Sequence, residues 1–197
     1  MTKIVLASAS ASRAGLLRNA GIAFAVEPAA IDERAVEAPL GAAGAASADI
    51  AMALAEAKAL AVATHHADAL VIGADQVLVA DGRCWHKPAD LGEAHAQLLA
   101  LAGRTHELHT AVVVARAGAA AWSHRETARM TMRQMTAVEV DAYLDDVGEA
   151  ALTSVGAYQI EGPGIRLFDA IDGDYFAILG MPLLPLLGFL RKAGAAP

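Results

Sequence analysis

Two serines and an arginine stand at a junction near the N-terminus where an anion could bind. Ile4 to Ala7 has the pattern of a short buried strand, and Arg13 to Ala20 has that of a helix. Such a junction offers backbone N–H groups and the positive end of a helix, and Ser8 and Ser10 add hydroxyl donors. The guanidinium of Arg13 has the planar fork that suits phosphate. Taken alone, the segment is better explained as a serine-rich cap beside a surface arginine, with a phosphate site as the functional alternative.

An acidic residue, Asp75, interrupts the most apolar strand pattern of the chain, 69–80. A carboxylate inside an apolar strand is costly unless it is paired, hydrogen-bonded or bound to a metal. Strand ends in α/β sheets face the ligand crevice, which favours a functional carboxylate here. A structural carboxylate that is bonded to nearby backbone is the alternative that this residue alone leaves open.

Lys58 is a cation on the apolar side of a predicted helix that runs from a Ser47 cap to about His65. At about 100° per residue it falls between Leu54 and Val62. A lysine there either snorkels to solvent or reaches from the edge of the core into a cleft.

Two further charged residues are expected in loops. Proline stiffens the segment that presents Lys87, and Glu33 lies in a stretch with weak periodicity, 28–46, which we expect to be mainly loop. Each of them, when taken alone, is better explained as an ordinary surface charge.

Composition excludes several classes of function. The 197 residues carry a net charge of −7, which argues against gripping a nucleic-acid backbone. The single cysteine, Cys84, rules out an internal disulfide and a multi-cysteine metal site. No apolar run reaches the length of a membrane span, and the N-terminus lacks a secretory signal pattern. We therefore expect a soluble, cytoplasmic protein with no nucleic-acid or membrane partner.

The histidines do not predict a zinc site. His65 and His66 are adjacent, so their side chains are expected to diverge on a helix, and His106 and His109 are expected on opposite faces of a strand. The sequence also lacks a Walker-type loop, a Gly-x-Gly-x-x-Gly fingerprint and a nucleophile elbow.

Strand and helix patterns alternate along the chain, with turn signals at Asp81-Gly82, Gly118 and Asp172-Gly173. This alternation with hairpins predicts an α/β fold with a mixed sheet. Besides the elements named above, strands are expected at 22–26, 105–115, 120–134, 165–171 and 174–178, and helices at 90–102, 136–147 and from 182 onward.

Taken together, the segments resemble the Maf family of nucleoside triphosphate pyrophosphatases in one order over nearly the whole chain. Each piece is weak, whereas the ordered set is specific. The segments that carry the resemblance are 6–10 with 13–17, 31–33, 54–59, 73–77, Lys87-Pro88, 103–107, 148–150, 156–158, Glu161-Gly162, 173–175 and 180–182.

The resemblance implies a single Maf-like domain over residues 1–197, with an elongated mixed β-sheet, flanking helices and two lobes around a central cleft. It implies a homodimer that uses Mg²⁺ or Mn²⁺ to hydrolyse a nucleoside triphosphate to the monophosphate and pyrophosphate. Carried over by position, Asp75 would activate water and share the metal with Glu33. The expected substrate-binding residues are Ser8, Ser10, Arg13, Lys58, Lys87, Gln76 and Glu161.

The sequence departs from the common family pattern in two places. The family often has Pro-Arg where Ala11 and Ser12 stand, so Arg13 is the one cation left there. Gln76 and Glu161 resemble the branch that prefers 7-methyl-GTP, whereas the branch for dTTP and UTP often has threonine and glutamine. A carboxylate can accept the N–H donors of guanine and gains from the cationic methylated base. A uracil or thymine carbonyl would face Glu161 unpaired.

Two alternatives stay open at this point. One is a house-cleaning enzyme like the inosine triphosphate pyrophosphatases, which share a similar fold and reaction. The other is a nucleotide-binding regulator, for example of cell division, because a binding site needs many of the same charged groups.

Overall fold

The computed structural model describes residues 2–196. Within them, seven strands form one mixed sheet with the order β2-β1-β3-β5-β6-β7, and β4 pairs with β3. β1 pairs in parallel with β2 and β3, whereas the β3–β4 and β6–β7 pairs are antiparallel. The strands are β1 (Lys3–Leu6), β2 (Ala25–Val26), β3 (Ala69–Ala80), β4 (Arg83–Trp85), β5 (Thr105–Arg116), β6 (Ala119–Met132) and β7 (Phe168–Asp172).

Seven α-helices and three 3₁₀ segments accompany the strands in this part of the chain. None of these helices combines the length and the apolarity that crossing a membrane requires. The helices are α1 (Ala11–Asn19), α2 (Glu33–Ala42), α3 (Ser47–Ala63), α4 (Leu91–Leu101), α5 (Ala137–Val147), α6 (Tyr175–Ile178) and α7 (Leu183–Lys192). The 3₁₀ segments are η1 (Gly148–Thr153), η2 (Val155–Ala157) and η3 (Pro163–Leu167). The predicted α/β class with a mixed sheet is confirmed.

The chain divides into two compact units. The first consists, among the described residues, of 2–76, 109–127 and 174–196, and the second of Val77–Leu108 and Ala128–Gly173. Strands β3, β5 and β6 contribute residues to both units. The single Maf-like domain over residues 1–197 and the cleft between two lobes stay predictions.

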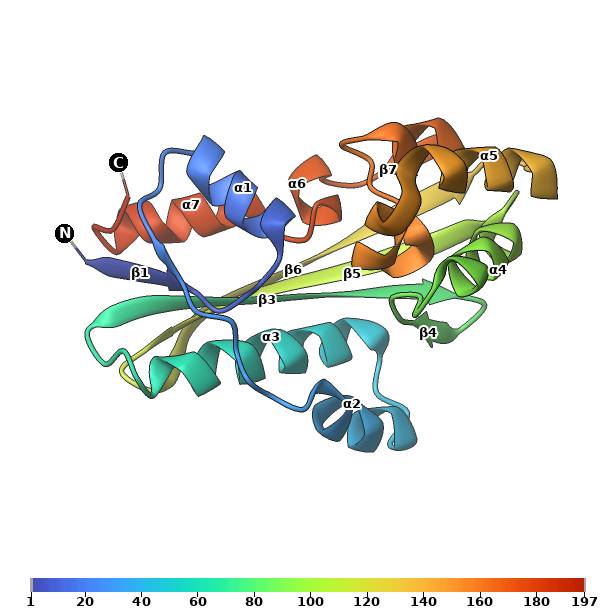
Figure 1. Ribbon diagram of the computed structural model, residues 1–197. Coiled ribbons are helices and arrows are strands. Elements are labelled where there is room, and N and C mark those ends of the chain that lie inside the picture. Colours follow the sequence, from blue (N-terminus) through green and yellow to red (C-terminus); the bar gives the residue numbers. More distant parts are fainter. Residues whose placement is uncertain (1, 197) are drawn as a thin grey trace. The chain divides into compact units, whose positions relative to one another are not determined.

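In the first unit, helices α1 and α7 cover one face of the sheet and α3 covers the other (Figure 1). Alternate residues of each strand, such as Leu70, Ile72 and Ala74 of β3, are buried against the face that α1 and α7 cover. This period of two is what a pleated strand dictates. The helices supply Leu17 and Leu186, both with no exposed surface, to the same cluster.

On the other face, a glycine allows α3 to lie directly against β3. A Cβ atom at Gly73 would lie 2.6 Å from the amide nitrogen of Ala59 and closer still to the carbonyl oxygen of Ala55. No side chain fits there, so the helix backbone takes its place. Asp75 lies two residues beyond Gly73 and therefore shares its face of the strand, toward the helix that carries Lys58.

Several predicted elements are confirmed. β3 covers the predicted 69–80, and the Asp81-Gly82 turn joins it to β4 with φ values of 51° and 72°. Helix α4 follows the side-chain cap of Asp90, and α5 follows a Thr136–Glu139 capping box. The predicted strand at 22–26 shortens to Ala25–Val26, and 165–171 divides into the end of η3 and most of β7.

Three local predictions are wrong, and each concerns the start of a helix. The expected loop at 28–46 contains α2, whose cap Asp32 accepts from the amides of Arg34 and Ala35, so Glu33 begins a helix. The expected strand at 174–178 is α6, because Asp174 accepts from the amide of Ala177. Helix α3 begins at Ser47 but its cap is Ala46, without a side-chain cap bond.

Candidate active site

The segment between β1 and α1 forms the predicted helix junction. Ser10 is the N-cap of α1, and its Oγ accepts from the amide of Arg13 at 3.3 Å. Ser8, which is buried, accepts from the amide of Ser10 at 3.2 Å. Helix α1 begins at Ala11, two residues before the predicted start, because the cap lies at Ser10. The hydroxyls thus shape the junction as well as offering donors at it.

Arg13 points into the protein and ties three segments together. Its Nε donates to the carbonyl of Gly180 at 2.9 Å, and its Nη1 donates to the carbonyl of Ala74 at 2.7 Å and to Ser8 Oγ at 3.2 Å. Burial lowers the pKa of Arg13 below its ordinary value, while the nearby charges of Asp75 and Glu33 raise it. The interpretation as a surface arginine beside the cap is wrong, because most of its donors meet internal acceptors.

Lys58 connects the two predicted acidic residues. Its Nζ lies 2.8 Å from Glu33 Oε1 and also donates to Asp75 Oδ1. The side chains of Lys58 and Asp75 are only 11% and 10% exposed, whereas that of Glu33 is 55% exposed. Lys58 therefore does not snorkel to open solvent, and its side chain holds Asp75.

Gln76 anchors the short helix α6. Its Nε2 lies 2.9 Å from Thr110 Oγ1 and 3.0 Å from the carbonyl oxygens of Ala177 and Ile178. Thr110 also donates to the carbonyl of Ala177 at 3.0 Å. Three consecutive residues of β3 are therefore fixed in three ways: Ala74 by Arg13, Asp75 by Lys58, and Gln76 by α6 and β5.

The structure brings together most of the predicted site residues within the first unit. Hydrogen bonds, ion pairs and charge interactions link the following residues directly or through one another: Ser8, Ser10, Arg13, Glu33, Lys58 and Asp75. Gln76 follows Asp75 on β3. Lys87 and Glu161 belong to the second unit, and their roles stay predictions.

Three positions of this site escaped sequence reasoning. Thr110 bonds the side chain of Gln76, and the carbonyl of Gly180 accepts from Arg13. Gly73 lets α3 approach Asp75. The glycine inside an apolar strand was the one available sign, because such glycines often mark a close backbone approach.

The donor set of this site fits a hard divalent cation. Glu33 and Asp75 converge on the single ammonium of Lys58, so their oxygens already share one cation. Mg²⁺ is commonly held by one or two carboxylates together with substrate phosphates and water. Among residues 2–196 no group of three or more histidine, cysteine or acidic side chains is placed to hold a metal. A metal on these two carboxylates would need further oxygens from a ligand or water.

Hydrogen bonds within the second unit hold the segment that leads to Glu161. Ile160 is buried and Glu161 is exposed. Tyr158 precedes Ile160 by two residues, and its hydroxyl lies 2.6 Å from Nε2 of the buried His106. Ser154 Oγ donates to the carbonyl of Tyr158 at 2.6 Å. These bonds fix the main chain shortly before Glu161.

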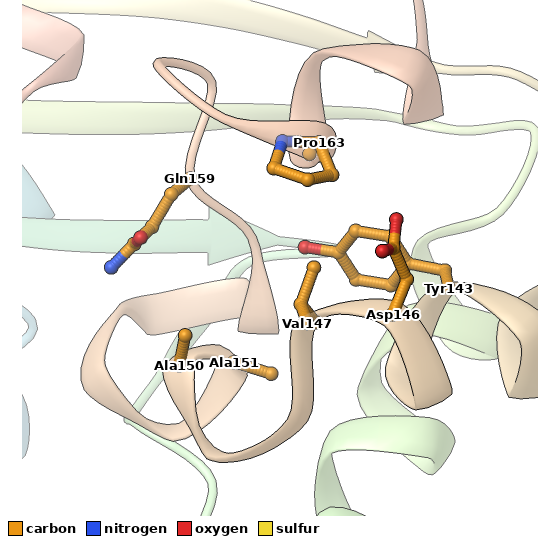
Figure 2. A pocket seen from close by; sticks show the side chains of 8 residues that line it. Tyr143, Asp146, Val147, Ala150, Ala151, Gln159 and Pro163 are labelled. Atoms are coloured by element: carbon orange, nitrogen blue, oxygen red, sulfur yellow. The ribbon is translucent and has the colours of Figure 1, made fainter.

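A pocket of about 220 Å³ borders the same segment (Figure 2). In Figure 2, Tyr143 and Val147 project toward it from α5, and Gln159 and Pro163 lie across from them. The lining residues are Tyr143, Asp146, Val147, Ala150, Ala151, Gln159, Pro163 and Gly164. The one acidic group among them, Asp146, pairs with Arg166. Because the lining includes no lysine or arginine, this pocket does not suit a triphosphate.

Two histidines behave differently from the expectation that they diverge. His65 and His66 follow the end of α3 and converge on one carboxylate, with His65 Nδ1 3.1 Å from Glu27 Oε1 and His66 Nε2 2.6 Å from Glu27 Oε2. The expected divergence is wrong because the helix ends at Ala63. These bonds lower the pKa of Glu27, and the bond from His66 has the largest effect.

Known proteins align with this chain over the whole region that contains the candidate site. The chain is 55% identical over 192 residues to a protein of Rhizobium meliloti named 7-methyl-GTP pyrophosphatase, covering 98% of this chain and 96% of that protein. It is 54% identical over 190 residues to a protein of the same name from Brucella abortus, covering 96% of each. It is 55% identical over 189 residues to a nucleoside triphosphate pyrophosphatase of Rhodopseudomonas palustris, covering 96% of this chain and 93% of that protein. The sequence profile described as Maf-like protein matches residues 3–193, and the chain belongs to this family.

Proposed function

We propose that this protein hydrolyses a nucleoside triphosphate between the α and β phosphates, releasing the monophosphate and pyrophosphate. The observation that carries the proposal is the buried Lys58–Asp75 pair, with Glu33 and Arg13 beside it. A carboxylate next to several cations is what water activation beside a polyphosphate needs. The names of the relatives from Rhizobium meliloti and Rhodopseudomonas palustris support the same reaction.

In the proposed mechanism, Asp75 accepts a proton from water as the water oxygen attacks the α phosphorus. The new P–O bond forms while the bond from that phosphorus to the α–β bridging oxygen breaks, and pyrophosphate leaves. Lys58 and Lys87 would offset negative charge on the leaving group. A divalent metal, when held by Glu33 and Asp75, would supply charge neutralisation at the phosphate oxygens. Ser8 and Ser10 would donate to the phosphates at the start of α1.

Arg13 has a more internal place in this scheme than a simple phosphate ligand. Its donors to Ala74 and Gly180 fix the main chain next to Asp75. Arg13 nevertheless interacts electrostatically with Asp75 and Glu33, since both carboxylates raise the pKa of Arg13. We therefore assign it mainly to positioning Asp75 and to setting the local potential.

For the base, we propose a preference for 7-methyl-GTP or a related modified guanine nucleotide. Glu161 would accept the guanine N–H donors and gain from the cationic ring. The nitrogen of Gln76 is engaged with α6, so Gln76 would influence base choice through that helix. The relatives named 7-methyl-GTP pyrophosphatase support this proposal.

A panel of triphosphates tests both levels of the proposal. The purified chain is assayed with Mg²⁺ or Mn²⁺ on 7-methyl-GTP, GTP, ITP, dTTP and UTP, with pyrophosphate and orthophosphate measured separately. Pyrophosphate release with the highest kcat/KM on 7-methyl-GTP is expected. Orthophosphate alone would refute the site of cleavage. A clear preference for UTP or dTTP would end the base assignment, and one for ITP would favour the inosine triphosphate alternative.

The remaining expectations concern the setting of the reaction. We propose a cytoplasmic homodimer that binds neither nucleic acid nor membrane. The acidic balance of the chain supports the absence of nucleic-acid binding, and the family resemblance supports the dimer. Light scattering of the purified chain tests the dimer, because a monomeric mass at micromolar concentration would contradict it.

A further inference from the structure

The ammonium of Lys58 contacts both of the carboxylates that would hold a divalent metal. It lies 2.8 Å from Glu33 Oε1 and also donates to Asp75 Oδ1. Two carboxylates that face one position repel each other unless a cation lies between them. In the protein alone, that cation is a side chain.

We propose that Lys58 is an internal counter-cation that competes with the divalent metal, so that metal binds strongly only together with the triphosphate. This rests on the proposed function, because the triphosphate is the anion that would give Lys58 a new partner. Metal and nucleotide binding are then positively coupled through a single lysine.

Burial makes this competition effective. The Lys58 side chain is 11% exposed, so a metal that displaced its ammonium would leave a largely buried charge without its anionic partners. An uncompensated buried charge is costly, and a divalent ion beside the ammonium would add repulsion. A triphosphate removes both costs, because its oxygens can accept from the ammonium and complete the shell of the metal.

Arg13 cannot perform the same exchange. It is the second cation that senses Asp75 and Glu33, but its Nε and Nη1 are held by Gly180, Ala74 and Ser8. The four-carbon stem of Lys58 ends in a single point charge with rotatable donors, and such a group can change partners. Lys58 is therefore the movable cation of the pair.

The first test measures Mn²⁺ binding by electron paramagnetic resonance, with no nucleotide present. The variant Lys58→Met keeps most of the side chain and removes its charged end. We expect it to bind Mn²⁺ at least tenfold more tightly than the unmodified chain. Adding Asp75→Asn to this variant should abolish the gain. The matched control, Lys192→Met, removes an exposed charge at the end of α7 and should leave Mn²⁺ binding unchanged.

The second test needs no variant of Lys58. The unmodified chain is titrated with Mn²⁺ in the presence and absence of the α,β-methylene analogue of GTP, with the Mn²⁺ bound by the analogue alone subtracted. At least tenfold tighter binding is expected with the analogue. Equal binding in both conditions overturns the proposal, as does a Lys58→Met variant that binds Mn²⁺ no more tightly than the unmodified chain.

Folding of the variant is checked by thermal unfolding with and without Mn²⁺. Because Lys58→Met leaves two carboxylates facing each other, Mn²⁺ should raise its melting temperature more than that of the unmodified chain. A smaller rise would count against the proposal. The Mn²⁺ measurements without nucleotide do not depend on turnover. A chain that cleaves no triphosphate would thus refute the proposed function while leaving the competition between Lys58 and Mn²⁺ measurable.

Discussion

The guanidinium of Arg13 donates to the main-chain carbonyl of Ala74, the residue that precedes Asp75, at 2.7 Å. The same side chain reaches the carbonyl of Gly180, which follows α6 by two residues. Arg13 thus holds the main chain on one side of the proposed base.

Replacement of Arg13 by lysine is expected to lower kcat more than it raises KM. Lysine keeps the charge but lacks the fork that reaches two carbonyls and a hydroxyl at once. A small displacement of a reacting group costs about a hundredfold in rate. Steady-state kinetics on the preferred triphosphate measures the split, with Arg191→Lys, on the surface of α7, as the control. A rise in KM alone would show that Arg13 acts chiefly by binding phosphate.

Asp75→Asn is expected to fold and to lose about a thousandfold in turnover, since the amide cannot accept the proton from water. Pyrophosphate release measures the loss, and circular dichroism checks the fold. The exposed Asp169 provides the matched change, Asp169→Asn, with a normal rate expected. Near-normal turnover of Asp75→Asn would refute its assignment as the base.

Gly73→Ala is expected to destabilise the first unit by about 3 kcal/mol, because the new Cβ meets the backbone of α3. The displacement of α3 should also lower turnover by drawing Lys58 away from Asp75. Urea unfolding measures the free energy of unfolding. In contrast, Gly15→Ala within α1 meets no atom within 4 Å and should stabilise by up to about 1 kcal/mol. Similar behaviour of the two variants would contradict the close approach at Gly73.

Acid is expected to weaken the second unit through His106. Burial lowers the pKa of His106 from 6.5 to about 4. The unfolded chain therefore binds the proton more readily between these values, and the contribution of neutral His106 is complete above pH 6.5 and declines as the pH falls toward 4. The loss is at most about 3 kcal/mol. Urea unfolding at several pH values should show the advantage of the unmodified chain over His106→Gln shrinking across this window. A constant difference between the two would argue against the burial effect.

Glu161→Gln is expected to lower kcat/KM for 7-methyl-GTP by about tenfold to a hundredfold, because a charged acceptor for the base is lost. The value for UTP should not fall. The comparison is made against Glu149→Gln, which removes an exposed carboxylate from η1. Parallel losses on both nucleotides would mean that Glu161 supports the fold or the phosphates instead of selecting the base.

Sequence patterns predicted the elements whose signals are strong and local. The apolar run of β3 and its Asp81-Gly82 turn were placed correctly. Helices α2 and α6 were missed because their starting points depend on side-chain caps at Asp32 and Asp174 within weakly periodic segments. An acidic residue before a weakly periodic segment is equally typical of a turn and of a helix N-cap.

The charged side chains of the site were also predictable, but most of their partners were not. The position of Lys58 on the apolar face of its helix left two outcomes open, a lysine that snorkels to solvent and a cation that reaches into a cleft. Its sharing between Glu33 and Asp75 depends on the docking of α3 over Gly73, which is a tertiary relationship. The roles assigned to Lys87 and Glu161 by family resemblance stay predictions.

The acceptors for Arg13 and Gln76 are largely main-chain oxygens, at Ala74, Gly180, Ala177 and Ile178. A point substitution at any of these four positions leaves its oxygen in place. A mutational scan of this region would therefore register the donors strongly and the acceptors weakly, although both halves of each bond are needed. If substitutions at positions 74 and 177 are tolerated, this does not mean that these residues lie outside the candidate active site.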